Sequence, residues 1–220
     1  MKKKYKAVIF DLDGTLLDTI DDIAISANTV LKRHGFPIHK TREYKLFVGE
    51  GMETLVYKIL PREKRSRSFI KKIIKEIRLE YSKNWNKNTK IYSGILDLLN
   101  FLQLKKIKMS VLSNKPDNFT KLMVKHFFPN IKFSFVLGTR TGVPKKPDPT
   151  VSLQIAKKLN IKPQDIVYLG DTNTDMKTAK NSGMFAVGAL WGFRTKSELI
   201  KNGAKLLIKK PMELFKKCFL

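Results

Sequence analysis

The stretch Lys6-Ala7-Val8-Ile9-Phe10-Asp11-Leu12-Asp13-Gly14-Thr15-Leu16 decides the fold. Its first half is a short apolar run, which predicts a buried β-strand over residues 6–10. Its second half places two aspartates, a glycine and a threonine directly after that strand. In open α/β sheets, ligands bind beyond the C-terminal ends of the strands. The end of this strand is therefore the first candidate for a functional site.

Downstream of residue 90, apolar strand patterns alternate with amphipathic helix patterns to the end of the chain. This alternation predicts a parallel sheet with right-handed crossovers. Residues 1–16 and 90–220 are therefore expected to form a doubly wound, Rossmann-like α/β core. The expected strands cover 108–112, 133–137, 166–169, 184–187 and 204–208, and the expected helices cover 95–104, 118–127, 150–159, 175–181 and 212–219.

Between these halves, residues 17–89 show only helical periodicity. Asp18 or Thr19 is expected to cap the first helix, which the Gly35-Phe36-Pro37 turn ends. Further helices are expected over 41–48, 52–60 and 66–84, the last with an apolar stripe opposite a basic face. The chain is therefore expected to carry an inserted all-helical domain.

The composition is strongly basic, with 44 Lys+Arg against 19 Asp+Glu, a formal net charge of +25 and a sequence pI of about 10.1. Basic surfaces neutralise nucleic-acid phosphates, which raises the possibility of such a partner. However, 36 of the basic residues are lysines scattered along the chain, and base-edge readout relies more on arginine. This pattern argues against a nucleic-acid partner and favours a compositional drift toward lysine.

The remaining composition indicates a folded protein in a reducing compartment. Hydrophobic residues make up 42% of the chain, which excludes a disordered one, and the single cysteine excludes a disulfide framework. No apolar run approaches the length of a membrane span, and residues 7–10 are too short for a secretory leader. A cytoplasmic protein with no membrane partner is expected.

Acidic and polar residues follow four of the predicted strands. Each piece alone has an ordinary explanation, such as a turn, a helix N-cap or a surface lysine. Together, four clustered carboxylates would repel one another and cost stability, which a divalent cation and one lysine would relieve. Oxygen ligands of this kind suit Mg²⁺. The candidates are Asp11 and Asp13, then Ser113-Asn114-Lys115, then Lys145-Lys146-Pro147, then Gly170-Asp171 with Asp175.

The order of these motifs resembles that of the haloacid dehalogenase superfamily, and within it the phosphoglycolate phosphatase branch. The motifs that carry the resemblance to the superfamily are Phe10–Leu16, Ser113, Lys146-Pro147 and Gly170-Asp171 followed by Asp175. The helical insert is similar to the superfamily's cap domain, which implies a core of residues 1–16 and 90–220 and a cap of residues 17–89. The resemblance to the branch rests on Asp18-Thr19, Asn28, Gly35-Phe36-Pro37, Phe47–Gly51, Ser113–Pro116, Lys146–Pro149 and Ala179–Gly183.

The resemblance implies a phosphatase that works through an aspartyl-phosphate. Asp11 would be the nucleophile, and Asp13 the general acid and then the base for water. Lys146 would stabilise Asp11 and the charge of the transition state. Ser113 and the backbone of Asn114 would hold phosphoryl oxygens. Mg²⁺ would be bound by Asp11, the backbone carbonyl of Asp13 and Asp171, with Asp175 nearby.

Substrate choice is expected to lie in the cap, in the loop Gly49-Glu50-Gly51, whose glycines let backbone N–H groups approach an anion. A tight turn before a helix explains the same loop equally well. Asp13 favours phosphate-ester chemistry, and Ile23 stands where mutases of the superfamily carry a histidine. Phosphoglycolate is the leading substrate. Another small phosphorylated metabolite (a sugar phosphate, nucleotide or pyrophosphate) stays open as the substrate. A non-enzymatic nucleic-acid-binding module stays open as an alternative function. The protein is expected to be a monomer or a homodimer.

Overall fold

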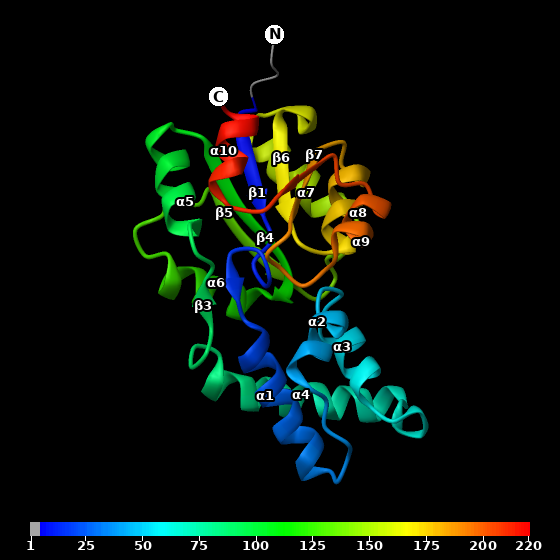
Figure 1. Cartoon of the computed structure of the whole chain (residues 1–220). Helices are drawn as coiled ribbons and strands as arrows, with labels where there is room; N and C mark the ends of the chain where they lie inside the picture. The colour runs from blue at the N-terminus through cyan, green and yellow to red at the C-terminus, as the bar shows by residue number, and fades with distance from the viewer. Residues whose placement is uncertain (1–4) are drawn as a thin grey trace. The chain divides into compact units, whose positions relative to one another are not determined.

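The structure is a computed structural model that describes residues 5–220. The chain forms two compact units, each drawn in Figure 1. The first, called the α/β unit here, comprises Met1–Leu17 and Ile91–Leu220. The second, called the helical unit, comprises Asp18–Lys90.

The α/β unit is built on a six-stranded sheet in which every paired strand is parallel. The strand order is β5-β4-β1-β6-β7-β8. From β1, the chain first adds β4 and β5 on one side of this strand and then adds β6, β7 and β8 on its other side. This arrangement confirms the doubly wound α/β class, and the reversal of direction lies beside β1. The strands are β1 (Ala7–Phe10), β4 (Lys108–Pro116), β5 (Phe135–Thr139), β6 (Ile166–Gly170), β7 (Phe185–Ala189) and β8 (Leu206–Ile208).

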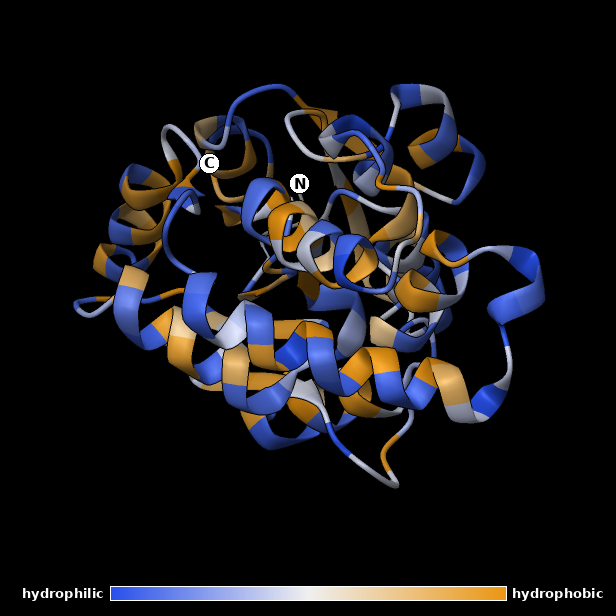
Figure 2. Ribbon diagram, turned by 90° about the horizontal axis from the view of Figure 1, so that it is seen from below, coloured by the Kyte–Doolittle hydropathy of each residue, from blue (hydrophilic) through white to orange (hydrophobic). Residues whose placement is uncertain are grey.

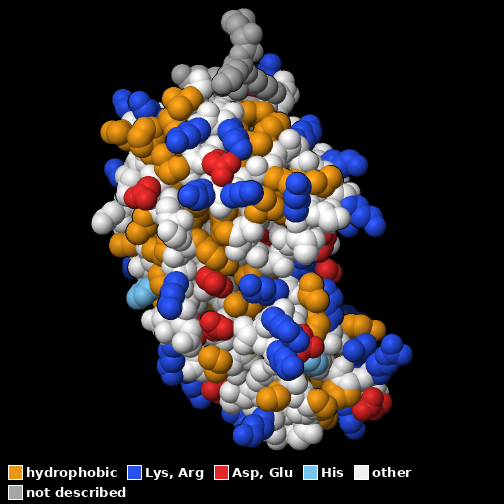
Figure 3. Space-filling model, viewed as in Figure 1, with side chains coloured by type: hydrophobic (Ala, Val, Ile, Leu, Met, Phe, Trp, Pro, Cys, Tyr) orange, Lys and Arg blue, Asp and Glu red, His pale blue; other side chains and the backbone are white. Residues whose placement is uncertain are grey.

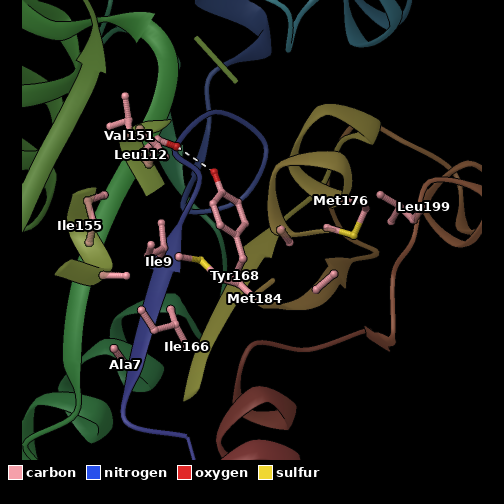
Figure 4. Close-up of a cluster of buried hydrophobic side chains, with 13 residues drawn as sticks. Ala7, Ile9, Leu112, Val151, Ile155, Ile166, Tyr168, Met176, Met184 and Leu199 are labelled. Carbon is pink, nitrogen blue, oxygen red and sulfur yellow. Dashed lines mark hydrogen bonds between the residues drawn. The ribbon is translucent and has the colours of Figure 1, made fainter. Parts of the chain in front are cut away.

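Helices cover both faces of the sheet. On one face, Ile9 of β1 packs in a core with Ile155, Met176 and Leu199 from three successive helices (Figure 4). Successive strand residues point to opposite faces. Phe185 therefore faces away from that core, and its ring lies 5.0 Å from that of Tyr5, which in turn lies 6.4 Å from Phe219 after the last helix. The helices are α5 (Ile95–Leu104), α6 (Asp117–Phe127), α7 (Thr150–Leu159), α8 (Asn173–Asn181), α9 (Lys196–Lys201) and α10 (Met212–Cys218).

Three local features of this unit differ from expectation. Helix α9 was not predicted, because six residues are too few to show a helical period. Helix α8 begins at Asn173, since Thr172 and Asp175 form a capping box in which each side chain accepts the other's backbone N–H. Strand β4 continues to Pro116, past an irregularity after Leu112. The polar residues expected in a loop after this strand therefore lie within it.

The helical unit contains α1 (Ile20–Arg33), α2 (Thr41–Phe47), α3 (Met52–Ile59), a 3₁₀ turn (Arg62–Lys64) and α4 (Arg67–Asn84). Hydrophobic and hydrophilic residues alternate along these helices in Figure 2. On α4 the buried residues recur every three or four positions, at Ile70, Ile73, Ile77 and Tyr81, as expected for an amphipathic helix. Two short strands, β2 (Leu17–Asp18) and β3 (Lys90–Ile91), pair in a separate two-stranded sheet.

The expected side-chain cap at the start of α1 is wrong. Thr19 is the N-cap residue, but its hydroxyl makes no capping hydrogen bond to the described helix. Its backbone has φ −107° and ψ 1°, whereas a capping side chain normally comes from an extended backbone. The acids Asp21 and Asp22 in the first turn still favour the helix N-terminus electrostatically.

Asp22 is a fully buried carboxylate that joins the start of α1 to the end of the helical unit. Its Oδ1 accepts hydrogen bonds from the backbone N–H and the side-chain amide of Asn88, at 3.0 and 2.9 Å. Its Oδ2 accepts from the backbone N–H and hydroxyl of Thr89, both at 2.8 Å. An ionised carboxylate accepts hydrogen bonds through both of its oxygens and can therefore pair with all four donors. An amide has only one accepting oxygen and cannot.

We expect Asp22→Asn to lower the free energy of unfolding by about 2–3 kcal/mol, because its NH₂ group would face donors and leave them unpaired. Denaturant titration followed by circular dichroism measures this loss. Asp21→Asn is the matched control, since Asp21 is exposed on the same turn and its replacement is expected to change stability by about 0.5 kcal/mol or less. Equal effects of the two substitutions would contradict the structural role of Asp22.

Candidate active site

Lys146 is the centre of the site in the α/β unit. Its Nζ lies 2.9 Å from Oδ1 of Asp11, directly after β1, and 2.7 Å from Oδ1 of Asp175, on α8. All three side chains are almost completely buried. Residues separated by more than 130 positions in the chain are therefore brought into direct ionic contact at the C-terminal ends of β1 and β6.

Asp171 completes a cluster of three carboxylates with Asp11 and Asp175. Each contributes an oxygen, and these oxygens all lie within 4.8 Å of one another. The ammonium of Lys146 balances only one of three negative charges if all are ionised. Uncompensated buried charge is costly, and oxygen ligands suit a hard divalent cation. The residues present therefore fit a bound metal ion.

The excess of negative charge shifts the pKa values of residues in the cluster. Burial and the neighbouring Asp175 raise the pKa of Asp11 well above its ordinary value, despite the opposing charge of Lys146. Burial and Asp175 also raise the pKa of Asp171, to about 7. Burial disfavours the charged form of Lys146, but Asp11 and Asp175 outweigh it and hold the pKa of that ammonium well above its usual range. Without a cation, the carboxylates of Asp11 and Asp171 resist ionisation.

Asp171 is fixed by groups from both ends of the chain. It accepts a hydrogen bond from the hydroxyl of Thr15 and another from the backbone N–H of Phe193, both at 2.8 Å. A Cβ on Gly192 would lie 2.3 Å from that of Asp171, so only glycine fits there. Residues 192 and 193 follow β7, and neither carries a polar side chain that would mark it in the sequence.

Asp13 lies beside Lys115, which belongs to the candidate segment Ser113-Asn114-Lys115 but had no role assigned from the sequence. The Nζ of Lys115 is 3.0 and 3.3 Å from the two carboxylate oxygens of Asp13. The side chains of both residues are largely buried, at 6% and 12% exposed. Lys115 comes directly after the noted Ser113-Asn114 pair, but one lysine among 36 gives no signal of its own.

Ser113 and Asn114 lie on β4, next to the same lysines. The hydroxyl oxygen of Ser113 accepts from the backbone N–H of Lys115 at 3.2 Å, which leaves its hydrogen to donate. The side chain of Asn114 both donates to and accepts from the backbone of Lys146, each at 3.0 Å. The side chain of Asn114 thus positions Lys146, so a direct role in binding would fall to its backbone.

Tyr168 of β6 is a further polar group that sequence reasoning missed. Its hydroxyl donates to the carbonyl of Leu112 at 3.4 Å, as the dashed line in Figure 4 shows. Its ring centroid lies 5.9 Å from the Nζ of Lys146. Burial raises the pKa of Tyr168 well above its ordinary value, so this hydroxyl stays neutral. Every residue of β6 is buried, so the sequence pattern of this strand does not indicate that Tyr168 would lie next to Lys146.

The loop expected to select the substrate belongs to the helical unit. Gly49 and Gly51 have φ of +118° and +93°, a region that favours glycine, and Gly51 precedes α3. The carboxylate of Glu50 lies 3.1 Å from the Nζ of Lys58. The turn before a helix is therefore present, and the binding role of these three residues stays a prediction.

The basic side chains form no single patch on the face drawn in Figure 3, where Asp and Glu lie among Lys and Arg. This dispersion agrees with the scatter of lysines along the sequence. Over residues 5–220, no helix is both long enough and apolar enough to span a bilayer.

Comparison with known proteins identifies relatives over nearly the whole chain. The family model described as haloacid dehalogenase-like hydrolase matches residues 8–189. The phosphoglycolate phosphatase of Aquifex aeolicus is 30% identical over 188 residues, 86% of each chain. That of Chromobacterium violaceum is 28% identical over 224 residues, 97% of this chain and 96% of its own. The crystal structure of a candidate phosphoglycolate phosphatase from Lactobacillus delbrueckii subsp. bulgaricus gives a TM-score of 0.89 at 30% identity, covering 98% of this chain and 99% of that one.

Proposed function

This chain belongs to the haloacid dehalogenase-like hydrolase family, and we propose that it is a Mg²⁺-dependent phosphomonoesterase whose preferred substrate is phosphoglycolate. The observation that carries the proposal is the buried cluster of Asp11, Asp171 and Asp175 around Lys146. Such a cluster of carboxylates is costly to bury unless it binds a cation. The relatives named phosphoglycolate phosphatase support the choice of substrate.

In this proposal, Asp11 attacks the phosphorus atom and forms an aspartyl-phosphate. Lys146, 2.9 Å from its carboxylate, orients Asp11 and offers positive charge to the phosphoryl oxygens. The hydroxyl of Ser113 and the backbone N–H of Asn114 donate to the same oxygens. Asp13 protonates the leaving oxygen and then takes a proton from the water that hydrolyses the intermediate.

Asp11, Asp171, Asp175 and the backbone carbonyl of Asp13 are the groups that would hold the metal. A bound Mg²⁺ supplies the positive charge that lets an anionic nucleophile meet an anionic phosphate. Thr15 and the backbone N–H of Phe193 keep Asp171 oriented toward the cluster, at 2.8 Å each. The protein's own contribution is thus to fix the ligands before the metal and substrate arrive.

Substrate selection is assigned to Gly49, Glu50 and Gly51 of the helical unit. Gly49 and Gly51 have positive φ and lie just before α3, and the backbone N–H groups of a helix N-terminus suit an anionic substrate. A screen of small phosphorylated metabolites, with Mg²⁺ and with EDTA, tests the assignment by phosphate release. Phosphoglycolate is expected to give the highest kcat/KM. A preference for a sugar phosphate, a nucleotide or pyrophosphate would overturn the substrate but keep the chemistry, whereas tight, salt-sensitive nucleic-acid binding without phosphate release would overturn both.

Stability is expected to depend on Mg²⁺ more strongly at pH 8 than at pH 5.5. A pKa of about 7 for Asp171, raised from its ordinary value, means that the folded metal-free protein binds more protons than the unfolded chain. Its stability therefore falls as the pH rises from about 4 to 7. Since Mg²⁺ binds ionised carboxylates, its addition restores most stability at high pH.

Thermal unfolding with Mg²⁺ and with EDTA at both pH values measures this difference. Asp171→Asn is the control, because the amide removes a charged ligand and is expected to reduce the Mg²⁺-induced rise in Tm at pH 8. The same rise in Tm at both pH values in the wild type would contradict the cluster's role as the metal site.

A further inference from the structure

Lys115 contacts the residue that acts on the leaving group in the proposed reaction. Its Nζ lies 3.0 and 3.3 Å from the two carboxylate oxygens of Asp13. Both side chains are largely buried. An ammonium group in such a place interacts strongly with an anion that comes within hydrogen-bond distance.

We propose that Lys115 is a specificity-determining residue that leaves Asp13 for a carboxylate of the substrate, attached beside the leaving oxygen. The proposal rests on the proposed function and deepens it. It predicts that the site selects phosphate esters of short hydroxy acids over neutral esters of the same size.

The position of Lys115 supports this role. A general acid must approach the leaving oxygen to about 3 Å, so the Nζ of Lys115 lies within roughly 6 Å of that oxygen. A carboxylate one carbon away from the leaving oxygen falls within that range. Lys115 and Asp13 both belong to the α/β unit, so this geometry does not depend on where the helical unit lies.

The other buried lysine of the site is already engaged by the protein's own acids. Lys146 contacts Asp11 and Asp175, at 2.9 and 2.7 Å, and faces the phosphoryl group in the proposed reaction. Lys115 instead faces the acid on the side of the leaving group. The two ammonium groups would thus bind two different charged groups of one substrate: Lys146 the phosphate and Lys115 the carboxylate.

The test compares phosphoglycolate with 2-hydroxyethyl phosphate, which has the same length but no carboxylate. The measured quantity is the ratio of kcat/KM for the two esters in the full-length protein with Mg²⁺. The wild type is expected to favour phosphoglycolate. Lys115→Met is expected to reduce this ratio by about 10- to 100-fold, the value of one lost charge-assisted contact, with most of the change in KM for phosphoglycolate.

Lys115→Gln keeps a polar head and is expected to reduce the ratio similarly, which provides a second variant should Lys115→Met fail to fold. Lys121→Met is the control, because Lys121 is exposed on α6, pairs with Asp117 at 2.7 Å and is outside the site. Its ratio is expected to match that of the wild type.

Two results would overturn the proposal. One is an unchanged ratio in the Lys115 variants with both esters slowed equally, because Lys115 would then act only on Asp13. The other is a wild type that hydrolyses both esters equally well. Failure of the proposed function is a different result, namely no Mg²⁺-dependent phosphate release from any ester by the wild type.

Discussion

Asp11→Asn is expected to reduce phosphate release from every phosphomonoester by on the order of 10⁴- to 10⁶-fold, as expected when a covalent nucleophile is removed. An amide is a far weaker nucleophile than a carboxylate, and no other described carboxylate is both adjacent to Lys146 and directly after β1. Initial rates with phosphoglycolate and with an activated aryl phosphate measure this loss.

The same substitution is expected to leave the fold intact. Burial and Asp175 raise the pKa of Asp11, so a neutral amide at this position spares the metal-free protein an unfavourable ionisation. Lys146 keeps its contact with Asp175 at 2.7 Å. The Tm in EDTA is therefore expected to stay within a few degrees of the wild-type value or to rise. Wild-type turnover by a folded Asp11→Asn protein would exclude Asp11 as the nucleophile.

The sequence predicted those parts of the site that depend on local order along the chain. Alternating strand and helix patterns are local, and parallel strands must present their C-terminal ends at one edge, so Asp11, Asp171 and Asp175 could be placed near one another. The contact of Lys146 with Asp11 was expected from the family resemblance, whereas its contact with Asp175 was not predicted.

Other parts of the site depend on contacts that no local pattern records. Lys115 meets Asp13 across 102 positions, and the Phe193 N–H meets Asp171 from the loop after a different strand. Gly192 is required because Asp171 and the backbone carbonyl of Gly14 lie against it. Such constraints arise from packing in three dimensions. A lysine or glycine that looks ordinary in the sequence is then restricted to one residue type by the groups that it contacts.

Asp13→Asn is expected to slow phosphoglycolate hydrolysis by about 10²- to 10⁴-fold, since general acid–base catalysis is worth that much. The effect should depend on the leaving group. The alkoxide of glycolate needs a proton, whereas p-nitrophenolate leaves without one. The first step with p-nitrophenyl phosphate is therefore expected to stay fast, while hydrolysis of the aspartyl-phosphate loses its base and becomes slow.

This difference predicts a burst of p-nitrophenolate, about one equivalent per active site, followed by slow turnover. Rapid-mixing absorbance measures the burst, and phosphate retained on the protein identifies the intermediate. The double variant Asp11→Asn/Asp13→Asn is the control and is expected to show no burst, since it lacks the residue that accepts the phosphoryl group. The Mg²⁺-induced rise in Tm should persist in Asp13→Asn, because the carboxylate of Asp13 is outside the cluster of Asp11, Asp171 and Asp175. Equal slowing of both substrates from the first turnover, without a burst, would show that Asp13 serves the attack of Asp11 rather than the departure of the leaving group.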